Sequence, residues 1–171
     1  RNSLLRTEKN TIKKQKEIEI WNKPLIQKGF SLWSKRKAMM NEFISFFIKT
    51  VNRFDKNLKL DIKYDLKSQN EEEYNIKLIE KTDSDIKKKH TSFGPHRDDV
   101  FFFWDQKQIK NHGSQGEHKL FLALLKITEQ LFLSQKTQKT PIFLIDDMFA
   151  NLDKERSKKL FLTQSELEQI K

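Results

Sequence analysis

Pro141-Ile142-Phe143-Leu144-Ile145-Asp146-Asp147 is the stretch that decides the fold of this chain. Four apolar residues after a proline predict a short strand that is buried on both faces. The strand ends on two carboxylates, and ligands of open α/β sheets gather at the carboxyl ends of such strands. Asp146 and Asp147 are therefore expected where a polyphosphate and its magnesium ion would bind. The same two aspartates also fit a plain turn that caps the next helix.

The segment before this strand predicts a helix whose start is open to an anion. Ser114 and Glu117 match the capping-box pattern, and apolar residues at helical spacing follow from Leu120 to Leu131. Glycines flank the Ser114-Gln115 pair, and such a helix start offers free N–H groups and a positive dipole to a phosphate. The structural alternative is a serine that only starts a buried helix. A polar turn through residues 134–140 is expected to join this helix to the strand.

Residues 91 to 109 predict a β-hairpin. Gly94-Pro95 leads into the apolar strand Val100–Trp104, a turn is expected at residues 105–107, and Gln108-Ile109 forms a short return strand. Two carboxylates, Asp98 and Asp99, lie just before the strand. With Asp146 and Asp147 they allow a metal-dependent nuclease as an alternative. His96 adds little to it, because no second His or Glu stands at ligand spacing.

The first half of the chain predicts mostly helix. Residues 1–20 are rich in Lys, Glu, Asn and Gln, which is typical of a solvated helix or one strand of a coiled-coil arm. Asn22 is expected to cap a second, long amphipathic helix that holds Pro24 in its first turn and runs to Val51.

A strand and a further helix follow. Strict alternation of apolar and charged residues from Leu58 to Leu66 predicts a half-exposed strand. After a turn through residues 68–70, the acidic Glu71–Glu73 and the basic Lys87–Lys89 stand where a helix start and a helix end prefer these charges. One helix is therefore predicted between them.

Composition favours a polyanionic partner. The net charge is +10, from 34 Lys and Arg against 24 Asp and Glu, which indicates nucleic acid or a lysine-rich solvated surface. No cysteine occurs, so disulfides and thiolate metal sites are excluded and a cytoplasmic location is expected. No apolar run reaches the roughly 18 residues of a membrane helix. The candidate DNA contacts on charge alone are Lys35, Arg36, Lys37, Lys87, Lys88 and Lys89.

Three motifs in sequence order resemble the C-terminal part of the RecF family of ABC-type ATPases, which is related to the SMC and Rad50 proteins. The resemblance covers residues from about Thr91 to Leu160. The motifs are Phe93-Gly94-Pro95-His96-Arg97-Asp98-Asp99, Gly113-Ser114-Gln115-Gly116, and Phe143-Leu144-Ile145-Asp146-Asp147 with Ala150-Asn151-Leu152-Asp153.

The resemblance implies a role for each matching residue. Ser114, Gln115 and Gly116 would be the signature motif, which reaches across a dimer to the γ-phosphate of ATP held by the other subunit. Asp146 would hold magnesium, and Asp147 would orient the attacking water in the place where most ABC ATPases carry glutamate. Asp153 would lie at the dimer interface, next to Asn151, which departs from the glutamate or histidine expected there.

The resemblance also implies an architecture and a cellular role. The fold class is mixed α/β: residues 1–90 form part of a helical second lobe or arm, and residues 91–171 form the C-terminal half of an ATPase lobe. The chain begins on Arg1 and lacks G-x-x-x-x-G-K-S/T, the loop that cradles phosphates, so a fragment that does not hydrolyse ATP unaided is expected. The intact protein would be an ATP- and magnesium-dependent homodimer that binds gapped or junction DNA. It would act with RecR/RecO-type mediators to load the recombinase.

Two other classes of function fit the residues. One is a basic, non-catalytic DNA-binding or scaffold module, in which Asp146 and Asp147 only cap a helix. The other is the two-carboxylate nuclease that uses Asp98 and Asp99 as well, and it would cleave DNA with magnesium but without nucleotide.

Overall fold

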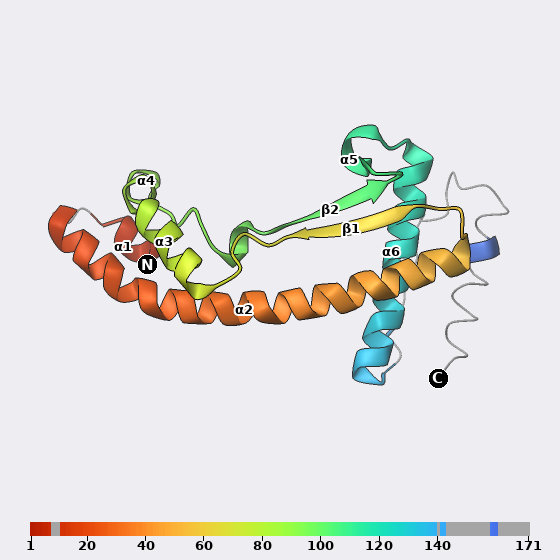
Figure 1. Cartoon of the computed structure of the whole chain (residues 1–171), viewed down its shortest axis with the longest axis horizontal. Coiled ribbons are helices and arrows are strands. Elements are labelled where there is room, and N and C mark those ends of the chain that lie inside the picture. The colour runs from red at the N-terminus through yellow and green to blue at the C-terminus, as the bar shows by residue number, and fades with distance from the viewer. Residues whose placement is uncertain (8–10, 140, 143–157, 161–171) are drawn as a thin grey trace. The chain divides into compact units, whose positions relative to one another are not determined.

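The computed structural model describes residues 1–7, 11–139, 141–142 and 158–160 (Figure 1). Contacts divide the chain into unit 1, made of Arg1–Met39 and Tyr64–Val100, and unit 2, made of Met40–Lys63 and Phe101–Lys171. Each unit takes residues from both sides of position 90, where the sequence predicts a lobe boundary. The assignment of the two predicted lobes stays a prediction.

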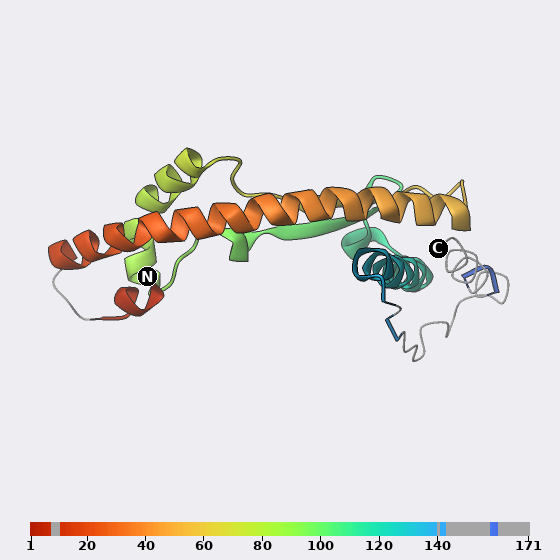
Figure 2. The same cartoon turned by 90° about the horizontal axis from the view of Figure 1, so that it is seen from below.

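The long helix α2 (Thr11–Phe54) contributes residues to both units (Figures 1 and 2). The prediction of a helix start at Asn22 is therefore wrong. Pro24 lies inside α2, and Asn22 is a buried helical residue whose side chain accepts a hydrogen bond from Arg1 Nε at 2.9 Å. A capping residue and a proline are local signals of a helix start. Here α2 continues through Asn22 and Pro24, and Asn22 is held by the contact with Arg1.

The N-terminal residues are not the solvated arm that their composition predicts. A short helix α1 (Asn2–Leu5) precedes α2, and both Leu5 and Ile18 are fully buried. The ammonium group of Lys14 donates hydrogen bonds to the carbonyl oxygens of Leu5 and Thr7, at 3.0 and 2.8 Å. These contacts fold the first residues back onto α2.

Two helices, not one, occupy residues 71–88. Helix α3 (Glu71–Glu80) begins as predicted, with the Asn70 side chain accepting a hydrogen bond from the backbone N–H of Glu73. A new helix, α4 (Thr82–Lys88), follows Lys81 and ends at Lys89, which adopts a left-handed conformation. The predicted single helix is thus interrupted at Lys81, while its two charged ends lie where expected.

The core of unit 1 is built around two aromatic side chains. Trp33 of α2 and Tyr74 of α3 are each 1% exposed, and their ring centroids lie 4.6 Å apart in an edge-to-face contact. Phe93 packs against both rings. Gly29 makes the approach possible, because a Cβ atom at this position would lie 2.7 Å from Tyr74 Cε1.

A three-stranded sheet has the order β1 (Leu60–Asp65), β2 (Asp99–Trp104) and β3 (Lys107–Gln108). Strands β2 and β3 pair antiparallel through a two-residue turn, whose residues Asp105 and Gln106 both have positive φ. The predicted hairpin is therefore confirmed. Its return strand is shifted by one residue, because Ile109 begins the next helix.

Unit 2 packs helices against the sheet. After α5 (Ile109–His112), helix α6 (Gln115–Thr137) buries the predicted apolar face, and Phe121 of α6 contacts both Phe47 and Phe102. Helix α6 continues to Thr137, so the predicted polar turn begins later than expected. Helices and a small sheet together confirm the mixed α/β class. No helix in the described ranges is long and apolar enough to span a membrane.

The structure describes Pro141 and Ile142 of the predicted buried strand. Ile142 is 90% exposed, so the expectation of burial is wrong for this residue. Phe143 to Asp153, with both carboxylates of the predicted magnesium site, lie outside the described residues.

Candidate functional site

The start of α6 has the geometry that the sequence predicts. Ser114 is the N-cap, and its Oγ accepts a hydrogen bond from the backbone N–H of Glu117 at 3.3 Å. Glu117 completes the capping box: its Oε2 accepts a hydrogen bond from the backbone N–H of Ser114 at 2.7 Å. Ser114 and Gln115 are exposed. A helix start of this kind presents N–H groups and a positive dipole to solvent.

The two glycines that flank this pair have different roles. A Cβ atom on Gly113 would lie 2.6 Å from Ile109 Cγ1 and 2.8 Å from the carbonyl oxygen of Ile109, so packing requires glycine there. A Cβ atom on Gly116 would meet nothing within 4 Å, and this residue lies in the helix. Glycine in a helix costs up to about 1 kcal/mol relative to alanine. Nothing in the described fold accounts for the missing side chain of Gly116.

The other predicted nucleotide residues, Asp146, Asp147 and Asp153, lie outside the described residues. Signals in the sequence that point to them are the apolar run before Asp146 and the spacing of Asp153.

Asp98, a carboxylate of the nuclease alternative, holds unit 1 together. Its side chain is 4% exposed and accepts hydrogen bonds from Trp33 Nε1 at 2.8 Å and from the Tyr64 hydroxyl at 2.5 Å. Arg36 NH1 lies 3.4 Å from Asp98 Oδ2 and also donates to the carbonyl oxygen of Pro95. A carboxylate with these partners serves the fold rather than a metal. The neighbouring Asp99 is exposed, and no cluster of three metal-ligating side chains occurs in the part of the chain that the structure describes.

Burial changes the acidity of both tyrosines of the chain. Burial and then the hydrogen bond to Asp98 raise the pKa of Tyr64 to about 12. Burial also raises the pKa of Tyr74 to about 12, with Arg1 acting in the opposite direction. Both hydroxyls are therefore protonated at neutral pH, and Tyr64 can donate its proton to Asp98.

The candidate DNA contacts fall into two groups. Lys35 and Lys37 are exposed on α2, whereas Arg36 between them is engaged with Asp98 and Pro95. Lys87, Lys88 and Lys89 are exposed at the end of α4, where their charge also suits the negative end of the helix dipole. The structure thus assigns Arg36 a role in the fold and leaves the five lysines accessible.

Sequence reasoning missed a basic pocket in unit 1. Only Lys88 among the candidate DNA contacts lines it; the other cations are Lys67, Lys77, Lys81 and Arg97. These residues stand up to 30 positions apart without a regular spacing, so no sequence pattern marks them as a group. One signal was available: each is cationic within a chain of net charge +10.

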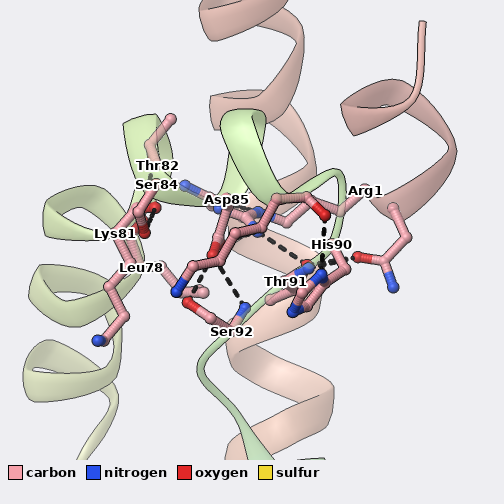
Figure 3. A network of polar contacts seen from close by, with 12 residues as sticks. Arg1, Leu78, Lys81, Thr82, Ser84, Asp85, His90, Thr91 and Ser92 are labelled. Carbon is pink, nitrogen blue, oxygen red and sulfur yellow. Dashed lines mark hydrogen bonds and ion pairs between the residues drawn. The ribbon is translucent and has the colours of Figure 1, made fainter.

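Ser92 of the pocket lining belongs to a network of polar contacts around Asp85 (Figure 3). Asp85 is fully buried and pairs with Arg1 NH1 at 2.7 Å. The same carboxylate accepts hydrogen bonds from the backbone N–H and the hydroxyl of Ser92, at 2.9 and 2.5 Å. Arg1 NH1 also donates to Thr91 Oγ1 at 2.8 Å. The network ties the first residue of the chain to the segment that enters the hairpin.

Comparisons with known proteins agree on one family, although no family model matches the chain. A "DNA replication and repair protein RecF" of Lachnoclostridium phytofermentans is 34% identical over 146 residues, which is 84% of this chain and 40% of that protein. The protein of the same name from Azobacteroides pseudotrichonymphae is 34% identical over 163 residues, or 94% of this chain and 43% of that protein.

Solved structures give the same result. A structure of the recombination mediator protein RecF-ATP in the RecFOR pathway matches 98% of this chain and 46% of its own, with a TM-score of 0.78 and 25% identity. A RecF-ATPrS structure from the same pathway gives a TM-score of 0.76. The chain therefore spans less than half the length of the relatives it matches.

Proposed function

Because this chain belongs to the RecF family, we propose that the intact protein is an ATP-dependent DNA-binding protein of DNA replication and recombinational repair. It would act in the cytoplasm on gapped or junction DNA, as an ATP-dependent homodimer that helps to load the recombinase together with RecR/RecO-type mediators. Support comes from relatives named for DNA replication and repair and from the RecF-ATP structure of the RecFOR pathway. This chain would supply the later part of the ATPase lobe and part of the second lobe.

The exposed start of α6 is the observation that carries this proposal. Ser114, Gln115 and Gly116 combine a capped helix N-terminus with a glycine that the fold does not require. A phosphate at this helix N-terminus would contact free backbone N–H groups and the positive end of the helix dipole. Gly116 has no side chain that would block its approach. We assign these residues to the γ-phosphate of ATP held by the partner subunit.

The carboxylates after the predicted strand complete the proposed site. Magnesium needs only one or two protein carboxylates besides phosphate oxygens and water, and Asp146 would supply one. The ion would neutralise charge on the phosphates. Asp147 would accept a hydrogen bond from the attacking water, and Asp153 would lie at the dimer interface.

The test is the substitution Asp147→Asn in the full-length protein. Loss of the carboxylate should lower ATP turnover at least about tenfold, because general-base assistance typically contributes a factor of 10² to 10⁴. Asp99→Asn, at an exposed carboxylate to which the proposed ATPase site assigns no role, is the matched control. ATP turnover is measured under saturating DNA and magnesium.

Unchanged turnover in Asp147→Asn would contradict the catalytic role. It would favour the non-catalytic DNA-binding or scaffold module, provided that the unsubstituted protein binds DNA. Cleavage of DNA with magnesium and without ATP would instead favour the nuclease.

A further inference from the structure

Unit 1 contains a basic pocket to which the proposed ATPase site gives no role. The pocket has a volume of about 540 Å³, within the range of about 300–1,000 Å³ that is common for ligand sites. Segments around α3, α4 and the hairpin entry contribute to it. Its cationic lining residues are Lys67, Lys77, Lys81, Lys88 and Arg97.

Three of these cations have no counter-charge in the described structure. Lys67 pairs with Asp65, and Lys77 pairs with Glu80 at 3.0 Å in an exposed contact along α3. Within the described ranges, Lys81, Lys88 and Arg97 form no ion pair, and the pocket lining contains no carboxylate. Like charges that share a pocket repel one another, so an anion that binds between them lowers the electrostatic energy.

The buried network of Asp85 fixes one wall of the pocket without cancelling its charge. Ser92 lines the pocket and is held in place by two hydrogen bonds to Asp85. Asp85 is fully buried and its charge is neutralised by Arg1 at 2.7 Å. The wall is therefore anchored, and its anchoring carboxylate does not compete for Lys81 or Lys88.

We propose that this pocket binds backbone phosphates of the DNA on which the intact protein acts. The inference rests on the proposed DNA-binding function and adds a surface to it. Several cations around one hollow suit a run of phosphates, which carry closely spaced negative charges. An acidic peptide is less favoured, because Phe93 is the one apolar side chain among the described lining residues and offers little anchorage for a peptide.

The position of Lys88 sharpens the test. Lys87 and Lys88 are neighbours in the last turn of α4, both exposed, and only Lys88 lines the pocket. The pocket variant is Lys81→Ala/Lys88→Ala/Arg97→Ala in the full-length protein. The matched control, Lys13→Ala/Lys16→Ala/Lys28→Ala, removes the same charge from exposed helical residues that lie outside the pocket and outside the candidate DNA contacts. A third variant keeps the charge: Lys81→Arg/Lys88→Arg/Arg97→Lys.

Binding of a fluorescein-labelled gapped duplex is measured by anisotropy at several salt concentrations. Each phosphate contact contributes about 0.9 to the slope of log affinity against log salt concentration. In the pocket variant, which lacks three cations, the magnitude of this slope should fall by about 2 to 3. Its affinity for DNA at low salt should fall at least about tenfold. The control and the charge-conserving variant should keep the slope of the unsubstituted protein to within about 1.

Several results would overturn the inference. Equal loss in the pocket variant and the control would show a general effect of net charge. If the unsubstituted protein binds DNA tightly and the pocket variant has the same slope, the pocket is not a DNA-binding site. The proposed function would not be affected by that result. Loss of binding to a labelled oligoglutamate peptide, without loss of DNA binding, would assign the pocket to an acidic protein segment. If the unsubstituted protein does not bind DNA, the proposed function itself is contradicted, and this inference with it.

Discussion

Asp98 joins three side chains of unit 1 through one carboxylate. Its partners are Trp33 and Arg36 on α2 and Tyr64 at the end of β1. Trp33 is 1% exposed, so its indole N–H has no access to bulk water. A buried donor that loses its acceptor keeps the full cost of desolvation, so this single residue should matter more for folding than its surface neighbour Asp99.

We expect Asp98→Ala to destabilise the protein by about 2–5 kcal/mol, because two buried or half-buried donors would lose their acceptor. Asp99→Ala, one residue away and exposed, should change stability by no more than about 0.5 kcal/mol. Urea unfolding followed by tryptophan fluorescence measures both. A similar stability of the two variants would contradict the anchoring role of Asp98.

The acidity of the tyrosines gives a prediction for alkaline pH. The pKa of Tyr64 and of Tyr74 is about 12 in the folded state and 10.0 in the unfolded reference. Below pH 10 both states keep the proton; between about pH 10 and 12 only the unfolded state loses it. These groups therefore stabilise the fold below pH 10, and this contribution is lost as pH rises toward 12.

The measurement is the absorbance of tyrosinate at 295 nm during titration of the full-length protein. The difference between the unsubstituted protein and Tyr64→Phe should rise near pH 12. In denaturant the same difference should rise near pH 10. A folded-state midpoint at pH 10 for Tyr64 would show that the hydroxyl is neither buried nor bound to Asp98.

At the scale of elements, the two glycines at the start of α6 separate packing from function. We expect Gly113→Ala to destabilise the protein, because its Cβ would lie 2.6 Å from Ile109 Cγ1 and must displace that side chain. Gly116→Ala has open space and should stabilise the fold by up to about 1 kcal/mol. Thermal unfolding measures both effects. If Gly116→Ala is as destabilising as Gly113→Ala, the fold itself requires Gly116, and it offers no support for the phosphate role.

Local signals in the sequence predicted several elements correctly. Ser114 and Glu117 predicted the capping box, and the acidic residues after Asn70 predicted the start of α3. The polar residues after the apolar strand Val100–Trp104 predicted the hairpin turn. Each of these features is set by contacts within a few residues, so the chain carries the information in adjacent positions.

Long-range contacts decided what the sequence could not predict. Asn22 and Pro24 have the composition of a helix start, yet α2 runs through both, and Asn22 accepts from Arg1, 21 positions away. Asp98 has the residue type of a metal ligand, but Trp33, 65 positions away in the sequence, donates a hydrogen bond to it. The basic pocket likewise arises only when α3, α4 and the hairpin entry come together.

At the scale of the whole molecule, the chain spans 40 to 46% of RecF relatives, and the phosphate-cradling loop is absent from its sequence. We propose that the nucleotide site of the intact protein is shared between subunits, with the start of α6 at the ATP of the partner. ATP should raise the dimer fraction, and the start of α6 should set how strongly it does so.

Ser114→Asp tests this dependence on the partner's ATP. Aspartate caps a helix about as well as serine, so stability should change by no more than about 0.5 kcal/mol. The added negative charge should repel the γ-phosphate. The association constant of the dimer in the presence of ATP should therefore fall at least about tenfold. Sedimentation velocity with and without ATP measures it. Undiminished dimerisation would contradict the assignment of Ser114 to the partner's nucleotide.

The capping box of α6 has a consequence for how the protein could release and rebind its ligand. The Ser114 hydroxyl uses a lone pair to accept from the backbone N–H of Glu117, and its own proton is not needed for the cap. In the site that we propose, this proton would be available for a phosphate oxygen of the partner's ATP. In the proposed site, ligand binding and helix capping would use opposite ends of one O–H bond, so the helix start would not need to unwind when ATP binds or leaves.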